Sequence, residues 1–484
     1  MVPLQAGTRG SPRRADAVSI RSTYRHPRSA KYRAPGGPWD VPPLPAVVGT
    51  EPALAQGLRT AGVRRGDVVA WQGPNWPEVV ALYRACWQLG AIAAPLHHQA
   101  GTAETERLVR ALDPKLFLAH DTLKAQVAAW QSGDRYHGVH ARSSDLAAIL
   151  WTGGSEGEPK GVLHTHRALV HKAQSMVHAH GLGATDAVLM PAPLAHISGL
   201  LNGILVPAAA SMRTVLMERW SPDDALTMIE REHITFMVGP PTFFLGLMGS
   251  PNFHSPRVAS LRLVSSGGAG VTPAFVQDAS TRLGATVKRS YGSTEAPTLT
   301  TSTVSDPAAR AVETDGRVVG DATLRIAADG ELVVQGPELF AGYLDSAQTR
   351  AAVANGWFQT GDLATFEDGW LTIVGRKKDV IIRAGENISA AEIERVVEAH
   401  PAVREAVAVA APDARLGESV YVFVVGDPSF DLAVCQRWFE TQGVARFKTP
   451  ERIAHVDHLP TLPAGKVDRA ALRANAARSA GVER

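Results

Sequence analysis

The sequence predicts an α/β protein with a large N-terminal body and a small α+β region at its C-terminal end. Three observations lead to this prediction. Short apolar runs alternate with helical segments from Glu51 onward, strand pairs joined by Gly and Asp follow Gly320, and a capped helix begins after residue 388. A chain of 484 residues exceeds one compact core, so two or more domains are expected.

The large body is predicted from a repeated strand–helix–strand pattern. Buried parallel strands appear as short apolar runs, and the helices between them have apolar residues at helical spacing. The expected elements are helices at 51–62 and 77–90 and strands at 66–72, 91–96, 186–194, 211–218, 234–239 and 261–268. This pattern is typical of parallel sheets covered by helices.

The C-terminal third of the chain has a different pattern. Apolar and polar side chains alternate between Gly and Asp turns, which is typical of antiparallel strands. Such strands are predicted at 330–336, 357–375 and 379–385. Ser389 and Glu392 form a capping-box pattern at the start of a helix predicted at 389–403.

Domain boundaries follow from these changes in pattern. We predict a large N-terminal domain over 46–376 and a small C-terminal domain over 377–484, divided within the charged stretch GRKKD (375–379). Residues 1–45 are predicted to form a poorly ordered basic arm. Its first 34 residues carry eight Arg and Lys against a single acid, Asp16.

Composition excludes several classes of partner. Lys and Arg number 49 against 47 Asp and Glu, and a net charge of +2 gives no electrostatic basis for binding nucleic acid or an anionic membrane. No apolar run reaches membrane-spanning length, and the N-terminus lacks the apolar core of a secretory signal. Cys86 and Cys435 fit neither a disulfide framework nor a zinc site, which predicts buried thiols in a cytoplasmic protein.

A histidine-rich stretch invites a metal-binding interpretation. Its members are His164, His166, His171, His178 and His180. Their spacing is irregular, and no Cys or carboxylate pattern accompanies them. We expect these side chains to pack against neighbours or to face solvent.

The stretch TGGSEGEPKG (152–161) has the composition of a phosphate-binding loop. Its glycines allow backbone N–H groups to turn toward an anion, and Lys160 supplies a positive charge. Pro159 before Lys160 excludes the Walker motif, and a proline in GGAGVTP (267–273) excludes the dinucleotide-binding fingerprint. A mobile surface turn has a similar composition, so this loop alone leaves both interpretations open.

Other segments carry groups suited to a nucleotide. In YGSTE, Tyr291 is suited to stack on a base, Thr294 to contact a phosphate and Glu295 to hold a hard cation. Asp362 lies in a Gly-Asp turn and is suited to accept hydrogen bonds from ribose hydroxyls. Lys466 follows a glycine in a loop near the C-terminus.

Together these segments resemble the motifs of the adenylate-forming superfamily, which contains acyl-CoA synthetases, peptide-synthetase adenylation domains and beetle luciferases. TGGSEGEPKG is similar to the family's phosphate loop, PLAHISGL (193–200) to its acyl-pocket segment, and YGSTE to its adenine and magnesium segment. GELVVQGPELFAGYL, TGD, GRKKD and GKVDR follow in the family's order. The resemblance extends from Glu51 to Leu472, and residues 220–244 most resemble medium-chain and alicyclic-acid CoA ligases.

The resemblance implies an ATP-dependent acyl-CoA synthetase. In such enzymes a carboxylate attacks the α-phosphorus of ATP, giving an acyl-adenylate and pyrophosphate, and the thiol of CoA then displaces AMP. It also implies Mg²⁺ as a cofactor, a distorted β-barrel within the large body and a mobile small domain. We expect a medium-chain, branched or cyclic acid, because GPPTFFLGLM and SSGGAGV are apolar or small and offer no countercharge for an amino acid's ammonium group.

The resemblance assigns roles to individual residues. Lys466 would bridge the substrate carboxylate and the α-phosphate, Glu295 would hold Mg²⁺, and Thr294 and Lys160 complete the expected catalytic set. The expected nucleotide contacts are Thr152, Gly153, Gly154, Ser155, Gly157, Gly268, Ala269, Tyr291, Gly292, Ser293, Asp362 and Arg376. The expected acyl pocket is lined by His196, Thr242 and Gly267.

A hinge and a thiol entry are implied in the same way. Lys378 matches the family's hinge position, about which the small domain is expected to rotate between the half-reactions. That rotation would withdraw Lys466 and bring Gly385, Glu386 and Asn387 to the thiol entry.

Two features depart from the family's pattern. Gly153 and Glu156 stand in the phosphate loop where Ser or Thr is usual. Two unit charges about 4 Å apart interact by roughly 4 kcal/mol at an effective dielectric constant near 20, so a carboxylate facing the triphosphate would weaken ATP binding. The region between Trp39 and Glu51 is also short, because the family usually has an additional strand pair there.

Two alternative functions and the oligomeric state remain open. An acyl-AMP ligase would pass the acyl group to a carrier protein, and a degenerate family member would bind nucleotide or acyl ligand without turnover. The first is less favoured because no insertion separates YGSTE from TGD, and the second because Lys466, Glu295, Asp362 and Arg376 are all present. A homodimer is compatible with the sequence.

Overall fold

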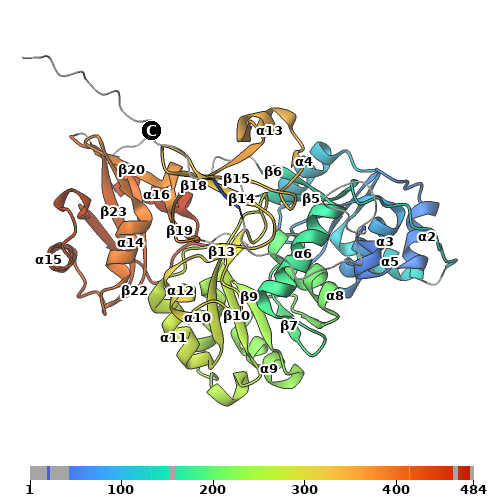
Figure 1. Cartoon of the computed structure of the whole chain (residues 1–484), viewed down its shortest axis with the longest axis horizontal. Helices are drawn as coiled ribbons and strands as arrows, with labels where there is room; N and C mark the ends of the chain where they lie inside the picture. Colours follow the sequence, from blue (N-terminus) through green and yellow to red (C-terminus); the bar gives the residue numbers. More distant parts are fainter. Residues whose placement is uncertain are drawn as a thin grey trace, which may run out of the picture.

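The computed structural model describes residues 19–21, 43–131, 133–152, 159–413, 415–461 and 467–479. The predicted α/β fold class is confirmed: an N-terminal body, blue to yellow in Figure 1, is followed by a smaller C-terminal part, orange to red. Of the predicted basic arm, the described residues include only β1 (Ser19–Arg21), which pairs with β14, and residues 43–45.

The first sheet has the order β16-β6-β5-β3-β2-β4. Strands β4, β2, β3 and β5 are parallel, and β6 returns antiparallel to β5. Its strands are β2 (Val68–Gln72), β3 (Ile92–Leu96), β4 (Leu116–Leu118), β5 (Leu146–Thr152), β6 (Lys160–Thr165) and β16 (Gly342–Tyr343). The accompanying helices are α1 (Pro45–Val48), α2 (Pro52–Thr60), α3 (Pro77–Leu89), α4 (Thr102–Leu112) and α5 (His120–Gln131).

The second sheet has the order β13-β12-β11-β10-β9-β7-β8, and its strands from β8 to β11 are parallel. The strands are β7 (Ala187–Met190), β8 (Arg213–Leu216), β9 (Phe236–Gly239), β10 (Leu263–Gly267), β11 (Thr286–Tyr291), β12 (Thr300–Thr301) and β13 (Arg317–Val318). The helical segments are α6 (His166–His180), α7 (Ile197–Leu200), η1 (Leu201–Leu205), α8 (Val206–Ala210), α9 (Pro222–Glu232), α10 (Pro241–Gly249), η2 (Ser255–Val258), α11 (Pro273–Leu283) and α12 (Ala308–Glu313).

Proline and hydroxyl side chains set the starts of these helices. Helices α3, α9 and α11 begin with Pro77, Pro222 and Pro273, because proline at the first helical position loses no hydrogen bond and has a helical φ. Ser221 and Thr272 cap α9 and α11 by accepting backbone N–H groups. Local sequence alone therefore fixes where several connecting helices begin.

The third sheet is antiparallel and contains the strands predicted at 330–336 and 357–375. Its order is β1-β14-β15-β18-β17, with β19 paired to β18. The elements are β14 (Thr323–Ile326), β15 (Glu331–Gln335), α13 (Ser346–Ala352), β17 (Val353–Ala354), β18 (Trp357–Glu367) and β19 (Trp370–Arg376). We call the part from α1 to β19 the large domain.

The part from β20 to α16, which we call the small domain, has its own sheet and its own core. Its elements are β20 (Val380–Arg383), β21 (Glu386–Ser389), α14 (Ala390–Glu398), β22 (Val403–Asp413), β23 (Gly417–Gly426), α15 (Leu432–Thr441), η4 (Arg446–Lys448), β24 (Arg452–His455) and α16 (Arg469–Ser479). Ile393 and Phe439 are buried in this core. A 3-10 turn, η3 (Lys377–Asp379), joins the two domains, and the predicted boundary at 376/377 stays a prediction.

The two cysteines and the helices bear on two of the expectations from the sequence. Cys86 and Cys435 are free thiols and both are buried. No helix in the described part of the chain combines the length and apolar character needed to cross a bilayer.

Candidate functional site

The expected acyl and adenine residues lie at one edge of the second sheet. Because β7, β9, β10 and β11 are parallel, the loops that follow them leave the sheet at the same edge. In that order, His196 lies in the loop after β7 and Thr242 lies in the first turn of α10 after β9. Gly267 to Ala269 lie at the end of β10 and just beyond it, and Tyr291 to Glu295 at the end of β11 and just beyond it. Ligands in open α/β sheets bind at this edge, so the arrangement agrees with a binding site there.

Two glycines at this edge have no room for a side chain. A Cβ on Gly267 would lie 2.2 Å from the carbonyl oxygen of Ser290, and one on Gly292 would lie 2.4 Å from the backbone nitrogen of Thr298. The neighbouring atoms belong to the backbone, so they cannot move aside easily. Close passage of the β10 and β11 loops therefore requires glycine at both positions.

Tyr291, Asp362 and Arg376 form a chain of contacts at the junction of the second and third sheets. The hydroxyl of Tyr291 donates to Oδ2 of Asp362 at 2.7 Å, and Nε of Arg376 lies 2.9 Å from Oδ1. Asp362 and Arg376 face each other in the register of β18 and β19. Burial and the neighbouring Asp362 charge raise the pKa of Tyr291 well above its usual value, so the phenol stays protonated and acts as a donor.

Glu295 and Lys160 meet at a residue that the sequence interpretation did not single out. The hydroxyl of Tyr343 donates to Oε1 of Glu295 at 2.8 Å, and Nζ of Lys160 lies 5.3 Å from the centroid of the Tyr343 ring. Tyr343 is brought there by β16, which pairs with β6 directly after Lys160. Burial and the Glu295 charge raise the pKa of Tyr343, so this phenol too is a donor.

The base of the phosphate loop is defined, and its tip is outside the described residues. Thr152 and Lys160 pair where β5 ends and β6 begins, on either side of the connecting loop. The loop residues outside the described part are Gly153, Gly154, Ser155, Glu156, Gly157 and Glu158. The hairpin therefore aligns the ends of the loop with Tyr343 and Glu295.

The lysine expected to be catalytic, Lys466, also lies outside the described residues. Thr461 and Val467, on either side of the loop that contains it, form a β-bridge. Helix α16 begins two residues after Val467, at Arg469. Thr294 and Ser293 precede Glu295 in a tight turn, in which the Ser293 nitrogen donates to the Ala296 carbonyl oxygen at 3.0 Å.

His196 occupies the residue before α7, and its ring contacts a second histidine. The rings of His196 and His97 are 5.3 Å apart and nearly perpendicular. His97 follows β3 of the first sheet, so the contact joins the two parallel sheets. Burial lowers the pKa of His97 to about 4, so it is neutral at pH 7.

The expected hinge residue lies in the turn that joins the two domains, and the expected thiol-entry residues lie at the start of the small domain. Lys378 is the middle residue of η3. Ala384 and Gly385 both have positive φ angles in the two-residue turn between β20 and β21, a conformation that favours glycine. Glu386 and Asn387 begin β21, and the Asn387 side chain is outside the described part.

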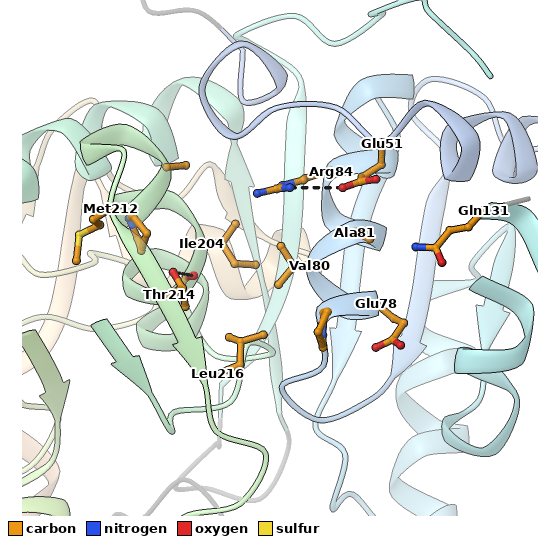
Figure 2. A pocket seen from close by; sticks show the side chains of 14 residues that line it. Glu51, Glu78, Val80, Ala81, Arg84, Gln131, Ile204, Met212, Thr214 and Leu216 are labelled. Carbon is orange, nitrogen blue, oxygen red and sulfur yellow. Dashed lines mark hydrogen bonds and ion pairs between the residues drawn. The ribbon is translucent and has the colours of Figure 1, made fainter. Parts of the chain in front are cut away.

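A separate cavity of about 530 Å³ lies away from all of these residues. Figure 2 shows it between α3 and β8, with Arg84 paired to Glu51 on one side and Thr214 and Leu216 on the other. None of the expected site residues lines it.

Fold and candidate site together define a class of protein: an α/β protein with a candidate nucleotide site at the edge of a parallel sheet. The chain belongs to the AMP-binding enzyme family. The model of the AMP-binding enzyme matches residues 52–344, and that of the AMP-binding enzyme C-terminal domain matches residues 392–466.

Curated relatives extend this match over most of the chain. The chain is 30% identical to the medium-chain fatty-acid–CoA ligase of Escherichia coli, covering 87% of this chain and 83% of the relative. It is 31% identical to the feruloyl-CoA synthase of an Amycolatopsis species, covering 87% and 91%. The protein is accordingly an AMP-forming acid–thiol ligase that uses ATP to make acyl-CoA.

Solved structures show the same fold. ATP-bound MatB from Rhodopseudomonas palustris is 27% identical and superposes with a TM-score of 0.80, covering 87% of this chain and 91% of MatB. The apo form of MatB, at 26% identity and with 88% and 92% covered, superposes with a TM-score of 0.71. The chain therefore superposes better on the ATP-bound form of MatB than on its apo form.

Proposed function

We propose that this ligase activates a medium-chain, branched or cyclic carboxylic acid and transfers it to CoA. The segments expected to line the acyl pocket are mostly apolar or small, and His196 and Thr242 are polar residues among them. The relatives' names, which include a medium-chain fatty acid and ferulate, support an acid with a sizeable apolar body. We further propose a role in fatty acid or lipid metabolism in the cytoplasm, which the two buried free thiols support.

In the first half-reaction an oxygen of the acid's carboxylate forms a bond to the α-phosphorus of ATP, and the bond from that phosphorus to the bridging oxygen of pyrophosphate breaks. Asp362 accepts hydrogen bonds from the ribose hydroxyls beside Arg376, and Tyr291 borders the adenine with Gly268 and Ala269. Lys466 and Lys160 neutralise charge on the reacting groups, which otherwise repel each other.

Glu295 has the chemistry expected of a Mg²⁺ ligand. The residue is 9% exposed and one carboxylate oxygen accepts from Tyr343, which leaves the second oxygen for a hard cation. Mg²⁺ commonly binds one or two carboxylates together with substrate phosphates, so a single protein carboxylate here is sufficient. When bound, Mg²⁺ would reduce the negative charge of the triphosphate.

In the second half-reaction the sulfur of CoA attacks the acyl carbonyl carbon, the thiol proton is released, and AMP leaves with the electrons of the acyl–phosphate bond. Rotation about Lys378 would withdraw Lys466 and bring Gly385, Glu386 and Asn387 to the thiol entry. The short turn η3, which contains Lys378 and joins the two domains, supports a change in domain arrangement at this point.

The observation that carries the proposal is the contact of Asp362 with both Tyr291 and Arg376. It provides a fixed acceptor for a ribose next to the sheet edge expected to hold the adenine and the acyl group. The test is a panel of straight-chain, branched and alicyclic acids with ATP and CoA, with pyrophosphate and free thiol measured together. We expect both acid-dependent pyrophosphate release and thiol loss.

The other outcomes identify the alternatives. Pyrophosphate release without loss of CoA thiol would contradict the choice of acceptor and favour transfer to a carrier protein. Absence of pyrophosphate release over the whole panel, with ATP still bound, would contradict catalysis and favour a binding protein.

A further inference from the structure

Asn75 connects the first sheet to the second. It lies between β2 and α3 and is 5% exposed. Its Nδ2 lies 3.1, 2.9 and 3.1 Å from three carbonyl oxygens to which it donates, those of Met190, Ala192 and Met217. Its Oδ1 accepts the backbone N–H of Leu194 at 2.8 Å. Since Met190 ends β7 and Met217 directly follows β8, one side chain ties the ends of two strands to the loop before α7.

The contacts of Asn75 require an amide. Three carbonyl oxygens need a donor and one backbone N–H needs an acceptor, and asparagine supplies both from one short side chain. An ionised aspartate could only accept, and a leucine of similar size could do neither. Loss of the amide would therefore release the loop from Ala192 to Leu194 and leave buried backbone groups without this partner.

Tyr83 holds the same loop from α3. Its hydroxyl donates to the carbonyl oxygen of Leu194 at 2.8 Å, and the residue is fully buried. Its ring packs against Trp71 and Trp87, with centroids 4.9 and 5.1 Å away. Both the N–H and the carbonyl group of Leu194 are thus bound by side chains that belong to the first sheet and its helix.

The position of this loop determines that of His196, two residues after Leu194. The backbone nitrogen of His196 donates to the carbonyl oxygen of Pro193 at 2.9 Å. A Cβ on Gly199 would lie 2.1 Å from the same oxygen, so the loop packs directly on α7 with no space between them. Because close-packed groups transmit a displacement, a shift of the loop would also move His196 and the start of α7.

We propose that Asn75 and Tyr83 are positioning residues that determine which acids the enzyme accepts, by fixing the loop that carries His196 in the acyl pocket. This inference rests on the proposed function, including the place of His196 in that pocket. In the described part of the chain, neither side chain is hydrogen-bonded to a residue expected to bind the nucleotide. Their loss should therefore change the use of the acid and leave the KM for ATP unchanged.

The test compares two acids in Asn75→Leu: the best and the poorest of the acids that wild type adenylates. Acid-dependent exchange of pyrophosphate into ATP gives kcat/KM for each acid and needs no thiol acceptor. A loosened pocket discriminates less, so the ratio of the two values should fall about 3- to 10-fold. A purely structural loss would reduce the amount of active enzyme, which lowers both values together and leaves their ratio unchanged.

Gln88→Met is the matched control. Gln88 is also a buried amide, on α3, and it donates to the carbonyl oxygens of Tyr136 and Gly138, at 2.8 and 3.1 Å. Its Oε1 accepts the backbone N–H of Glu51 at 3.1 Å. The variant removes the same kind of contacts from a different loop, so it should destabilise the fold and leave the ratio of the two acids unchanged.

Tyr83→Phe supplies an independent arm that keeps the ring and removes one hydrogen bond. It should lower the ratio in the same direction as Asn75→Leu but by less, and it tests the inference even where Asn75→Leu does not fold. A wild-type ratio in Tyr83→Phe and in folded Asn75→Leu, or an equal fall in Gln88→Met, would overturn the inference. Failure of the proposed function would look different, because wild type itself would then show no exchange with any acid.

Discussion

The hydroxyl of Tyr343 lies 2.8 Å from Oε1 of Glu295, and the ring of the same tyrosine has Nζ of Lys160 5.3 Å from its centroid. One side chain thus lies between the expected magnesium ligand and the lysine at the end of the phosphate loop. Tyr343 orients the Glu295 carboxylate by donating to one oxygen. The second Glu295 oxygen is the one that we expect to bind Mg²⁺.

Tyr343→Phe tests that arrangement. It removes the hydroxyl and keeps the ring beside Lys160. A hydrogen bond to a charged group contributes about 1.5–3 kcal/mol, so kcat/KM for ATP should fall at least 10-fold and the Mg²⁺ concentration needed for half-maximal rate should rise. Tyr421→Phe, at a buried tyrosine in the small domain, is the control and should leave both unchanged. An unchanged Mg²⁺ requirement in Tyr343→Phe would show that this hydroxyl does not orient the metal ligand.

A buried ion pair, Lys172 with Glu338, gives a stability prediction. Nζ of Lys172 lies 3.4 Å from Oε1 of Glu338 and donates to the carbonyl oxygen of Val319 at 2.7 Å. Their side chains are 0% and 1% exposed. Lys172→Met leaves a buried carboxylate without its countercharge, so the free energy of unfolding should fall by about 3–5 kcal/mol in urea titrations.

Two further variants separate charge from packing at this pair. Adding Glu338→Gln to Lys172→Met should recover part of the loss, because the neutral amide can still accept the backbone N–H of Ala322. Lys115→Met, at an exposed lysine, should change stability by less than about 0.5 kcal/mol. A double variant as unstable as the sum of the single variants would contradict the buried-charge explanation.

His166 predicts a loss of stability in acid. Its Nδ1 accepts the backbone N–H of Leu44 at 3.2 Å, and burial lowers its pKa from 6.5 to about 4. In the unfolded chain the His166 imidazole is protonated below pH 6.5, whereas in the folded chain it is protonated only below about pH 4. This contribution to stability is complete above pH 6.5 and is lost as the pH falls to 4, by up to about 1.4 kcal/mol per pH unit.

The measurement is the free energy of unfolding in urea at pH 7, 5.5 and 4.5. His166→Gln should reduce the decrease between pH 6.5 and 4, because glutamine does not titrate. His254→Gln, at an exposed histidine, should leave the pH dependence as in wild type. An identical pH dependence in wild type and His166→Gln would contradict this role of His166.

Much of the fold was predictable because its causes are local. The helix predicted at 77–90 is α3, which begins at Pro77 and ends before Gly90 in the left-handed conformation. The predicted capping box is confirmed on its N-terminal side, since Ser389 accepts the N–H of Glu392 at 3.3 Å. The spacing of apolar residues and the capping of helices depend on neighbouring residues only, so a single sequence is enough to predict them.

The contacts within the site were not predictable in the same way. Glu295 and Tyr343 are separated by 48 residues, and their contact exists because β16 pairs with β6. GELVVQGPELFAGYL was recognised as a motif, but nothing local marks its tyrosine as the partner of Glu295. The ion pairs of Lys377 with Asp329 and Glu331 were not predictable either, because they depend on how the third sheet places these two carboxylates.

The claim that two half-reactions use different arrangements is tested most directly with Lys466→Ala. Adenylation should be abolished, measured as acid-dependent exchange of pyrophosphate into ATP, because no other residue is expected to bridge the two reacting anions. Thioester formation from synthetic acyl-adenylate and CoA should be largely retained, because Lys466 is expected to leave the site before that step. An equal loss of both half-reactions in Lys466→Ala would contradict the account.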